Sequence, residues 1–349
     1  MTKIAINGFG RIGRAFLRAL EQSSGKTALQ VVVINDLMSA EECGYLLQYD
    51  SVYGRAPFTV SLESGALMVA GKKIALLAEP EPAKLPWGQL GVDIVVESSG
   101  FFASFEKSKA HLDAGAKRVV ITAPVKDAPP DGGAGGATVL MGINEDKLAT
   151  CNITSNASCT TNAASPVIQI LHEALGVEKA LLNTTHAYTA SQALVDGPAK
   201  HSKSKDHFRD GRAAAHNIVP SSTGAAIAVT QAVTDLAGKF DGISLRVPVI
   251  AGSIVDVTFL ASRDTTAEEV NNILRKAAGE VRWQKVFAVS DEPLVSCDIV
   301  GMPQASIADL PMTRVVGGNL VKVLAWYDNE AGYAHALLEH VSKTAEYIK

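Results

Sequence analysis

Cys159 is of a residue type, and in a sequence context, that suits nucleophilic catalysis. It stands in the string SNASCTTN, after a β-type segment at 152–155 and at the start of a helical segment that runs toward Leu175. A thiol at the first turn of a helix faces unpaired N–H groups and the positive end of the helix dipole, which favour the thiolate. An arbitrary buried cysteine is more often a small hydrophobic residue. The polar neighbours of Cys159 indicate a reactive site instead.

His186 is the residue that could act as the acid and base for this thiol. It lies 27 residues after Cys159, in the string NTTHAYT at the end of the next predicted strand. A helix followed by a returning strand could bring it back beside the thiol, where an imidazole would stabilise the thiolate, take a proton as hydride leaves, and orient the oxyanion. A histidine at a strand end is more often structural, so the spacing alone does not decide between the structural and the catalytic role.

A glycine pattern near the amino terminus indicates a dinucleotide site. Gly8, Gly10 and Gly13 form GFGRIG between an apolar run and a helical pattern. Such glycines let the backbone turn tightly and approach a pyrophosphate that binds the N-terminal N–H groups of the helix. Asp36 follows 23 residues after Gly13 and ends the next predicted strand, where its carboxylate can bind the adenosine ribose and favour NAD over NADP. The alternative is a strand-to-helix turn that uses glycine only for packing. It explains less well why strand, helix, second strand and acidic residue follow one another at these spacings.

Composition fits an ordinary globular enzyme. The chain has 349 residues, 47% of them hydrophobic, which is enough for two domains. A net charge of −4 with no long charged run gives no expectation of a nucleic-acid or membrane partner. No signal peptide or membrane span is expected, so the predicted compartment is the cytoplasm. Four cysteines make no disulfide framework, and no Cys/His spacing predicts a metal site.

The first half of the chain alternates β-branched runs with helical patterns, which is typical of βαβ units and a parallel sheet. A Pro- and Gly-rich segment at 129–138 is predicted to be a surface insertion. Strands are expected at 3–7, 31–36, 93–98 and 118–122, with a helix at 11–20.

The second half predicts a mixed or antiparallel sheet with helices. A helix from Cys159 should end near Gly176, and Thr266 with Glu269 forms a possible capping box for another. The fold class is therefore α/β: a Rossmann domain of residues 1–158 with 329–349, and an α+β catalytic domain of residues 159–328. Strands are expected at 179–188, 243–249, 254–261, 313–316 and 320–326, a long loop at 199–210, and a final helix at 334–348.

Several strings together make the chain resemble the glyceraldehyde-3-phosphate dehydrogenase family over nearly its whole length. They are INGFGRIGR, IND, ASCTTN, HAYT, STGAA, RVPV and WYDNE. The resemblance implies a glycolytic, NAD-dependent, phosphorylating oxidation of D-glyceraldehyde 3-phosphate to 1,3-bisphosphoglycerate. In that reaction Cys159 adds to the aldehyde, hydride passes to NAD, and inorganic phosphate resolves the thioester. It also implies a homotetramer whose loop at 194–212 lies between subunits.

The resemblance further implies roles for individual residues. Asn329 would contact the nicotinamide carboxamide, and four other residues would line the cofactor site: Arg11, Ile12, Ser99 and Thr122. The attacking phosphate would meet Ser158, Thr160, Thr223 and Gly224. The substrate phosphate would meet Thr189 and Arg246, since hydroxyls and an arginine fork suit phosphate geometry.

Two departures from the family pattern affect the substrate site. Asp210 stands where the family usually has an arginine facing the substrate phosphate, and Ser191 stands where it usually has an aspartate. Lys203, Lys205 or Arg209 could supply the missing charge. If none does, a charged hydrogen bond of roughly 1.5–3 kcal/mol is lost, which weakens substrate binding about tenfold to a hundredfold.

Three questions therefore stay open. One alternative is a dehydrogenase of another phosphorylated aldehyde such as erythrose 4-phosphate, although HAYT and STGAA favour glyceraldehyde 3-phosphate. A second is a non-catalytic nucleotide-binding relative, which would have no need of an activated thiol at Cys159 beside His186. Use of NADP in addition to NAD is the third.

Overall fold

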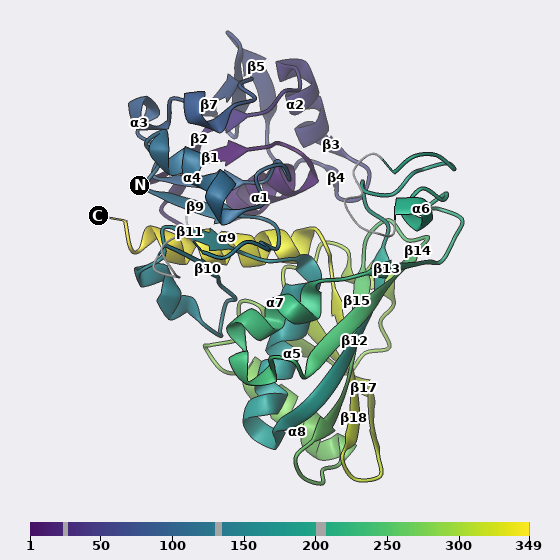
Figure 1. Cartoon of the computed structure of the whole chain (residues 1–349). Coiled ribbons are helices and arrows are strands. Elements are labelled where there is room, and N and C mark those ends of the chain that lie inside the picture. The colour runs from purple at the N-terminus through teal and green to yellow at the C-terminus, as the bar shows by residue number, and fades with distance from the viewer. Residues whose placement is uncertain (24–26, 130–134, 200–206, 349) are drawn as a thin grey trace. The chain divides into compact units, whose positions relative to one another are not determined.

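A computed structural model describes residues 1–23, 27–129, 135–199 and 207–348 (Figure 1). Its contacts divide the chain into two compact units, Met1–Ala157 with Leu337–Lys349, and Ser158–Ala336. The sequence placed the second boundary at 329, whereas the structure places it after Ala336. The difference arises because helix α9 (Ala331–Ala345) begins in the second unit and ends in the first.

The first unit is built on a nine-stranded sheet in the order β10-β11-β9-β8-β1-β2-β7-β6-β5. The strands from β10 to β7 pair in parallel, and β6 and β5 extend the edge in antiparallel pairing. The strands are β1 (Thr2–Asn7), β2 (Leu29–Asn35), β5 (Val60–Glu63), β6 (Ala66–Val69), β7 (Lys72–Leu77), β8 (Ile94–Glu97), β9 (Arg118–Ile121), β10 (Gly136–Thr138) and β11 (Ile153–Ser155). A separate pair joins β3 (Tyr49–Asp50) to β4 (Gly54–Arg55), and the helices are α1 (Arg11–Gln22), α2 (Ala40–Gln48), α3 (Trp87–Leu90) and α4 (Phe105–Asp113).

The predicted parallel core is confirmed, but its antiparallel edge was not foreseen. Each strand expected in this half is present within two residues of its predicted ends. The segment 129–138 was predicted to be an insertion; residues 130–134 lie outside the described residues, and Gly136–Thr138 form strand β10 against β11. The carboxyl end of the predicted insertion is therefore part of the sheet.

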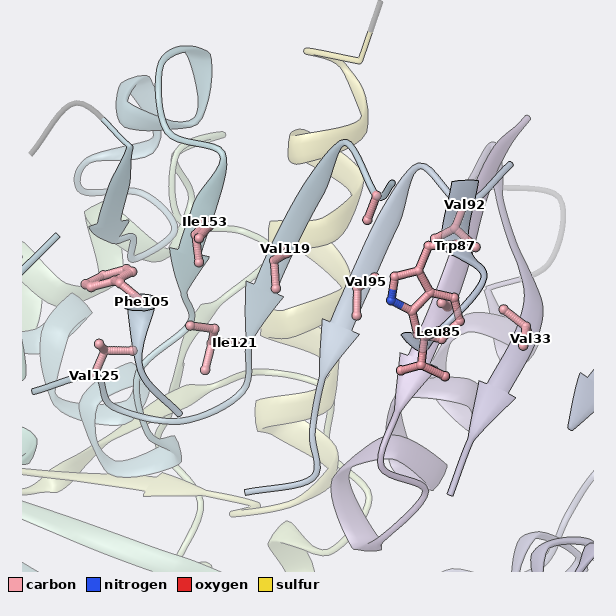
Figure 2. Close-up of a cluster of buried hydrophobic side chains, with 12 residues drawn as sticks. Val33, Leu85, Trp87, Val92, Val95, Phe105, Val119, Ile121, Val125 and Ile153 are labelled. Carbon is pink, nitrogen blue, oxygen red and sulfur yellow. The ribbon is translucent and has the colours of Figure 1, made fainter. Parts of the chain in front are cut away.

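Apolar side chains from successive strands form the core on one face of this sheet. Val95, Val119 and Ile153 come from β8, β9 and β11, and Figure 2 shows them along these strands. Trp87 is fully buried in the same cluster, together with Leu85. Because parallel strands are covered on both faces, their residues form near-continuous apolar runs such as IVV in β8. This core fixes the carboxyl ends of β1, β2 and β8, where the glycine-rich turn lies.

The second unit has a seven-stranded mixed sheet in the order β13-β14-β12-β15-β18-β17-β16. Only β12 with β14 and β16 with β17 pair in parallel among the described residues. The strands are β12 (Val177–Ala187), β13 (Val219–Ser222), β14 (Phe240–Val247), β15 (Ser253–Ala261), β16 (Phe287–Ser290), β17 (Ser306–Val316) and β18 (Leu320–Tyr327). The helices are α5 (Cys159–Leu175), α6 (His207–Asp210), α7 (Ala225–Ala232) and α8 (Ala267–Ala278).

Helices α5, α7 and α8 pack on one face of this sheet (Figure 1). Strand β15 shows the consequence, since buried and partly exposed residues alternate along its length as expected for a sheet covered on one side. The mixed-sheet prediction is confirmed, although β17 begins seven residues before the predicted 313. The capping box predicted at Thr266 is only half formed: its hydroxyl accepts from the Glu269 N–H, while the Glu269 carboxylate binds Arg263 and Thr265.

Candidate functional site

The second unit brings Cys159 and His186 together. Cys159 is the first residue of α5, and Ser158 caps this helix by accepting a hydrogen bond from the Thr161 N–H at 3.1 Å. His186 lies near the end of β12 and is 4% exposed. The Cys159 Sγ and His186 Nε2 atoms are 3.3 Å apart. This distance permits direct proton transfer between thiol and imidazole.

A buried tyrosine, Tyr327, links the elements that carry this pair. The Tyr327 hydroxyl hydrogen-bonds the Thr160 hydroxyl at 2.9 Å and the Thr184 hydroxyl at 2.8 Å. Its ring meets the His186 ring edge to face, with centroids 5.8 Å apart. Tyr327 therefore connects helix α5 and strands β12 and β18 behind the pair. Sequence reasoning assigned no role to Tyr327, although it is the tyrosine of the string WYDNE.

The electrostatics of the pair differ from the sequence-based expectation. A helix N-terminus was expected to favour the thiolate, but desolvation raises the pKa of Cys159, and the positive charge of Arg246 only partly opposes this. Desolvation, followed by the charge of Arg246, lowers the pKa of His186 to about 3. Both shifts favour uncharged forms.

Arg246 contacts the other nitrogen of this imidazole. Strands β12 and β14 pair in parallel with His186 opposite Arg246, which sets the two side chains side by side. The Arg246 Nη1 atom lies 2.6 Å from His186 Nδ1 and 3.3 Å from the Ala187 carbonyl oxygen. The same carbonyl lies 2.7 Å from His186 Nδ1. An arginine predicted from the resemblance to bind phosphate is thus also a direct neighbour of the His186 imidazole.

The remaining residues predicted to bind anions are placed as follows. The Thr189 hydroxyl hydrogen-bonds the Ser191 hydroxyl at 3.0 Å, and both side chains are partly exposed. Thr223 accepts from the Ala225 N–H at 3.2 Å, and Gly224 is the exposed N-cap of α7 without a side-chain cap. Thr160 is turned toward Tyr327, so its hydroxyl is already used inside the protein.

The loop that carries the departures is partly described. Asp210 ends the short helix α6 and is 5% exposed, and its carbonyl oxygen accepts from the Ala193 N–H. The Arg209 Nη1 atom donates to the Pro220 carbonyl of β13 at 3.4 Å. Lys203 and Lys205, the other two residues named for the missing charge, lie outside the described residues. Arg209 is thus the one of the three whose contacts are defined.

The first unit contains a pocket of about 580 Å³ at the carboxyl ends of its parallel strands. Four predicted cofactor residues line it: Gly8, Gly10, Asp36 and Ser99. Gly8 has φ +95°, and a Cβ there would collide with the backbone of Ser99. A Cβ at Gly13 would collide with the Gly8 carbonyl. The glycines are therefore required by a close approach of two loops, as expected at the crevice of an open parallel sheet.

The polar groups of the pocket suit a dinucleotide. Gly10 caps helix α1 without a side-chain hydrogen bond, so the cap residue does not compete with an anion for the N-terminal N–H groups of the helix. The Asp36 carboxylate accepts from the Phe9 N–H at 2.5 Å and the Met38 N–H at 2.9 Å, which fixes it at the end of β2. Arg11 directs its side chain to Asp50, at 2.5 Å, rather than into the pocket.

Other predicted residues do not line this pocket. Gly13 and Ile12 lie in the first turn of α1, and Thr122 follows β9, where its N–H donates to the Glu97 carbonyl at 3.0 Å. Asn329 belongs to the second unit, is 5% exposed, and accepts from the Ser253 hydroxyl at 3.0 Å. Their predicted contacts with the cofactor stay predictions.

A buried network under the pocket was missed from the sequence. The Glu97 carboxylate, at the end of β8, accepts from Asn7 Nδ2 at 2.5 Å, from His111 Nε2 at 2.9 Å, and from the N–H and hydroxyl of Ser99. Trp87 Nε1 donates to His111 Nδ1 at 3.0 Å, which leaves the ring proton on Nε2. Asn7 and Ser99 line the pocket. The available signal was an acidic residue ending an otherwise apolar strand.

Metal-ligand clusters and membrane-spanning helices are both absent from the described residues. No group of three or more His, Cys, Asp or Glu side chains in the described part of the chain could hold a metal ion. Among the helices that the structure describes, none combines the length and the apolar character needed to cross a bilayer. All four cysteines are free thiols, and only Cys297 is exposed.

Comparison with known proteins places this geometry in a family. The family described as "Glyceraldehyde 3-phosphate dehydrogenase, NAD binding domain" matches residues 2–105, and "Glyceraldehyde 3-phosphate dehydrogenase, C-terminal domain" matches residues 158–329. Proteins named glyceraldehyde-3-phosphate dehydrogenase are similar over nearly the full length: that of Mycobacterium avium is 45% identical with 97% of each chain covered, and that of Clostridium acetobutylicum is 42% identical with 100% of each chain covered. A third, from Mycobacterium leprae, is 46% identical with 97% of each chain covered. The chain belongs to the glyceraldehyde 3-phosphate dehydrogenase family, with an NAD-binding Rossmann domain followed by the family's catalytic domain.

Proposed function

We propose that the chain is a phosphorylating glyceraldehyde 3-phosphate dehydrogenase that uses Cys159 as nucleophile and His186 as acid and base. The observation that carries the proposal is the 3.3 Å distance between Cys159 Sγ and His186 Nε2 in a chain of this family. At this distance the His186 imidazole can accept the thiol proton as sulfur adds to a carbonyl carbon.

The residues of the second unit account for the proton movements. As the Cys159 thiol adds to the aldehyde, His186 takes the sulfur proton and returns it to the new oxyanion, which gives a thiohemiacetal. When hydride leaves the thiohemiacetal carbon, His186 takes the hydroxyl proton, and a thioester remains on Cys159. An oxygen of inorganic phosphate then attacks the thioester, the carbon–sulfur bond breaks, and the acyl phosphate leaves. The departing sulfur regains the proton held by His186, which restores the starting thiol and imidazole. The oxidation energy passes from the thioester to the acyl phosphate.

The first unit fits NAD. Gly8 and Gly13 stand where a Cβ would collide with neighbouring backbone, which lets the turn beside the pocket pack closely. The N-cap of α1 makes no side-chain hydrogen bond, and the Asp36 carboxylate is held at the end of β2. The helix N-terminus would bind the pyrophosphate, and Asp36 would bind the adenosine ribose and disfavour a 2′-phosphate. Bound NAD supplies the hydride acceptor of the reaction. Arg11, Ile12, Thr122 and Asn329 remain proposed contacts.

The proposed substrate carries a phosphate that binds Arg246 and Thr189. Arg246 is partly exposed and its guanidinium can form a charge-assisted fork with phosphate oxygens. Asp210 stands where the family usually has an arginine, and Arg209 is proposed to supply that positive charge. Its side chain donates to a carbonyl of β13, which pairs with β14, the strand that carries Arg246. Ser158, Thr223 and Gly224 are proposed for the attacking phosphate.

The chain is further proposed to act as a cytoplasmic homotetramer. Strands β12, β14 and β18 leave Leu181, Ile243 and Leu320 exposed by 66%, 56% and 41%. Exposed apolar side chains gathered on one sheet are typical of a subunit interface. Light scattering on the purified protein tests the proposal, and a monomer at micromolar concentration would contradict it.

The activity is tested by NADH absorbance. We expect NADH formation that requires glyceraldehyde 3-phosphate, NAD and inorganic phosphate together. Cys159→Ser should abolish turnover, whereas His186→Asn should leave a slow residual rate and a less reactive thiol. Cys297→Ser serves as the matched control, because this exposed thiol belongs to neither site. A Cys159→Ser variant with wild-type rates would exclude the mechanism.

The same assay separates the alternatives. A higher kcat/KM with erythrose 4-phosphate than with glyceraldehyde 3-phosphate would assign the chain to that aldehyde. NAD binding without any phosphate-dependent NADH formation would instead indicate a non-catalytic nucleotide-binding protein.

A further inference from the structure

Ser253 makes two buried hydrogen bonds that join distant parts of the second unit. It is the first residue of β15 and is 1% exposed. Its hydroxyl oxygen accepts from the Ala187 N–H at 3.0 Å, and its hydroxyl proton is donated to the Asn329 amide oxygen at 3.0 Å. A backbone N–H can only donate, so the serine proton is left for Asn329. These two bonds, which we call the Ser253 bridge, span 66 and 76 positions of sequence.

The register of the sheet places this bridge. Strand β15 lies between β12 and β18. Its pairing with β18 sets Ser253 opposite Tyr327, two residues before Asn329. Its other neighbour, β12, runs antiparallel to it and ends at Ala187. The Ser253 bridge therefore joins the ends of both flanking strands at the edge where they leave the sheet.

The Ala187 side of the bridge is in contact with the His186 imidazole. The Ala187 carbonyl oxygen lies 2.7 Å from His186 Nδ1, while Nε2 of the same ring lies 3.3 Å from Cys159 Sγ. Ala187 is fully buried, so removal of the serine hydroxyl would deprive a buried N–H of an acceptor and displace this backbone. Ser253 thus holds the backbone that orients the ring.

The Asn329 side of the bridge fixes which way an amide faces. Asn329 is 5% exposed, and its oxygen is occupied by the Ser253 hydroxyl. Its Nδ2 atom has no hydrogen-bond partner among the described residues. The side chain therefore offers N–H donors, and not its oxygen, to a bound group. The nicotinamide carboxamide, which Asn329 is proposed to contact, has a carbonyl oxygen that can accept from such donors.

We propose that Ser253 is a positioning residue that orients the nicotinamide carboxamide and the His186 imidazole through one hydroxyl. Through Asn329 it selects the amide orientation that donates to the carboxamide, and through Ala187 it keeps the ring beside Cys159. Hydride and proton leave the same thiohemiacetal, so the nicotinamide and the imidazole must be placed together. The inference rests on the proposed function, in which these two groups receive the hydride and the proton.

Nucleotide binding tests the Asn329 side of the bridge. Isothermal titration calorimetry on the full-length protein gives the Kd for NAD and the Kd for ADP-ribose, which lacks the nicotinamide. We expect Ser253→Ala to raise the Kd for NAD about threefold to tenfold, the worth of one ordinary hydrogen bond, and to leave the Kd for ADP-ribose unchanged. Asn329→Ala should show the same selective loss, and adding Ser253→Ala to it should cause no further loss. General damage to the fold would weaken both ligands alike.

Thiol reactivity tests the Ala187 side of the bridge. In the protein without nucleotide, Ser253→Ala should slow the alkylation of Cys159 by iodoacetamide at least about threefold, because a displaced imidazole contributes less to removal of the thiol proton. Cys297, an exposed thiol outside the proposed site, is the internal control and should react at the wild-type rate.

Ser244→Ala is the matched control. Ser244 lies on β14, the other neighbour of β12, and is 3% exposed. Its hydroxyl has no hydrogen-bond partner among the described residues. The substitution removes the same atom from the same sheet without breaking a bridge, so both readouts should keep their wild-type values.

An unchanged ratio of the two Kd values in Ser253→Ala, or an unchanged rate of Cys159 alkylation, would overturn the proposal. An unchanged ratio in Asn329→Ala would overturn it whether or not Ser253→Ala folds. Neither readout uses turnover. Both changes in the variants with no NADH formation by the wild-type protein would contradict only the proposed function, and NADH formation with neither change would contradict only the role of Ser253.

Discussion

His340 should make the first unit sensitive to mild acid. It is fully buried in α9, where Nε2 contacts the Thr154 hydroxyl at 2.8 Å and Nδ1 contacts the Asn156 amide oxygen at 3.0 Å. Desolvation lowers its pKa from 6.5 to about 3. Between these two pKa values His340 is therefore neutral in the folded protein and protonated in the unfolded chain. The stability that this histidine contributes is fully present above pH 6.5 and is lost as the pH falls from 6.5 toward 3.

The magnitude follows from proton linkage. With a pKa of 6.5 unfolded and about 3 folded, lowering the pH from 7.5 to 5 reduces the free energy of unfolding by about 2 kcal/mol through this one group. His340→Gln removes the titration. The variant should lose about 2 kcal/mol less than the wild-type protein over the same pH interval, whatever its stability at pH 7.5.

Tryptophan fluorescence can report this unit alone. The chain has three tryptophans, of which Trp87 lies in the first unit and Trp283 and Trp326 in the second. Urea denaturation of both proteins in a Trp283→Phe, Trp326→Phe background, at equal protein concentration and at both pH values, follows Trp87. Equal losses of stability in the two proteins would refute the reasoning, because His340 would then not be the group that resists protonation.

Three further predictions concern binding. Gly8→Ala should raise the Kd for NAD at least about tenfold, because a side chain at φ +95° meets the Ser99 backbone; Gly301→Ala, also at positive φ but with open space around it, is the control, and equal affinities would contradict the account. Glu97→Gln places an amide opposite donors of the buried network, so it should raise the KM for NAD more than it lowers kcat and destabilise the protein by about 2–4 kcal/mol in urea denaturation. An unchanged KM would show that the network does not position the pocket. Arg209→Ala should raise the KM for glyceraldehyde 3-phosphate about tenfold with little change in the KM for NAD, and an unchanged substrate KM would remove Arg209 from the phosphate site.

Local sequence signals were sufficient for the first βαβ unit. The apolar strand, the glycines and Asp36 lie within a short stretch of chain, so their geometry depends mainly on local interactions. The two capping boxes show where local sequence is sufficient to predict a contact and where it is not. Ser39 and Glu42 form a complete capping box that was present in the sequence and would have predicted helix α2. The box expected at Thr266 lost its second half because Arg263 attracts the Glu269 carboxylate.

The contacts that sequence reasoning missed are non-local. Arg246 meets His186 because β12 and β14 are parallel neighbours in register, although the two residues are 60 positions apart in the sequence. Glu97 meets Asn7 through the same kind of pairing between β8 and β1, and the two residues are 90 positions apart. Strand order and register set both contacts, and no local pattern in one sequence encodes them. The Cys159 and His186 pair was predictable because one helix and one strand join them.

The protonation of this pair limits how the reaction can begin. Burial raises the pKa of Cys159 and lowers that of His186, so each shift opposes a resting thiolate–imidazolium ion pair. On the proposed function, burial therefore favours a thiolate that forms as the aldehyde adds, when its charge can pass at once to the carbonyl oxygen. A thiol that stays neutral until substrate arrives also resists oxidation and adventitious electrophiles, because the thiolate is the reactive form. On the proposed function, desolvation thus links the activation of Cys159 to the arrival of the aldehyde, because burial disfavours the thiolate until a carbonyl oxygen can take its charge.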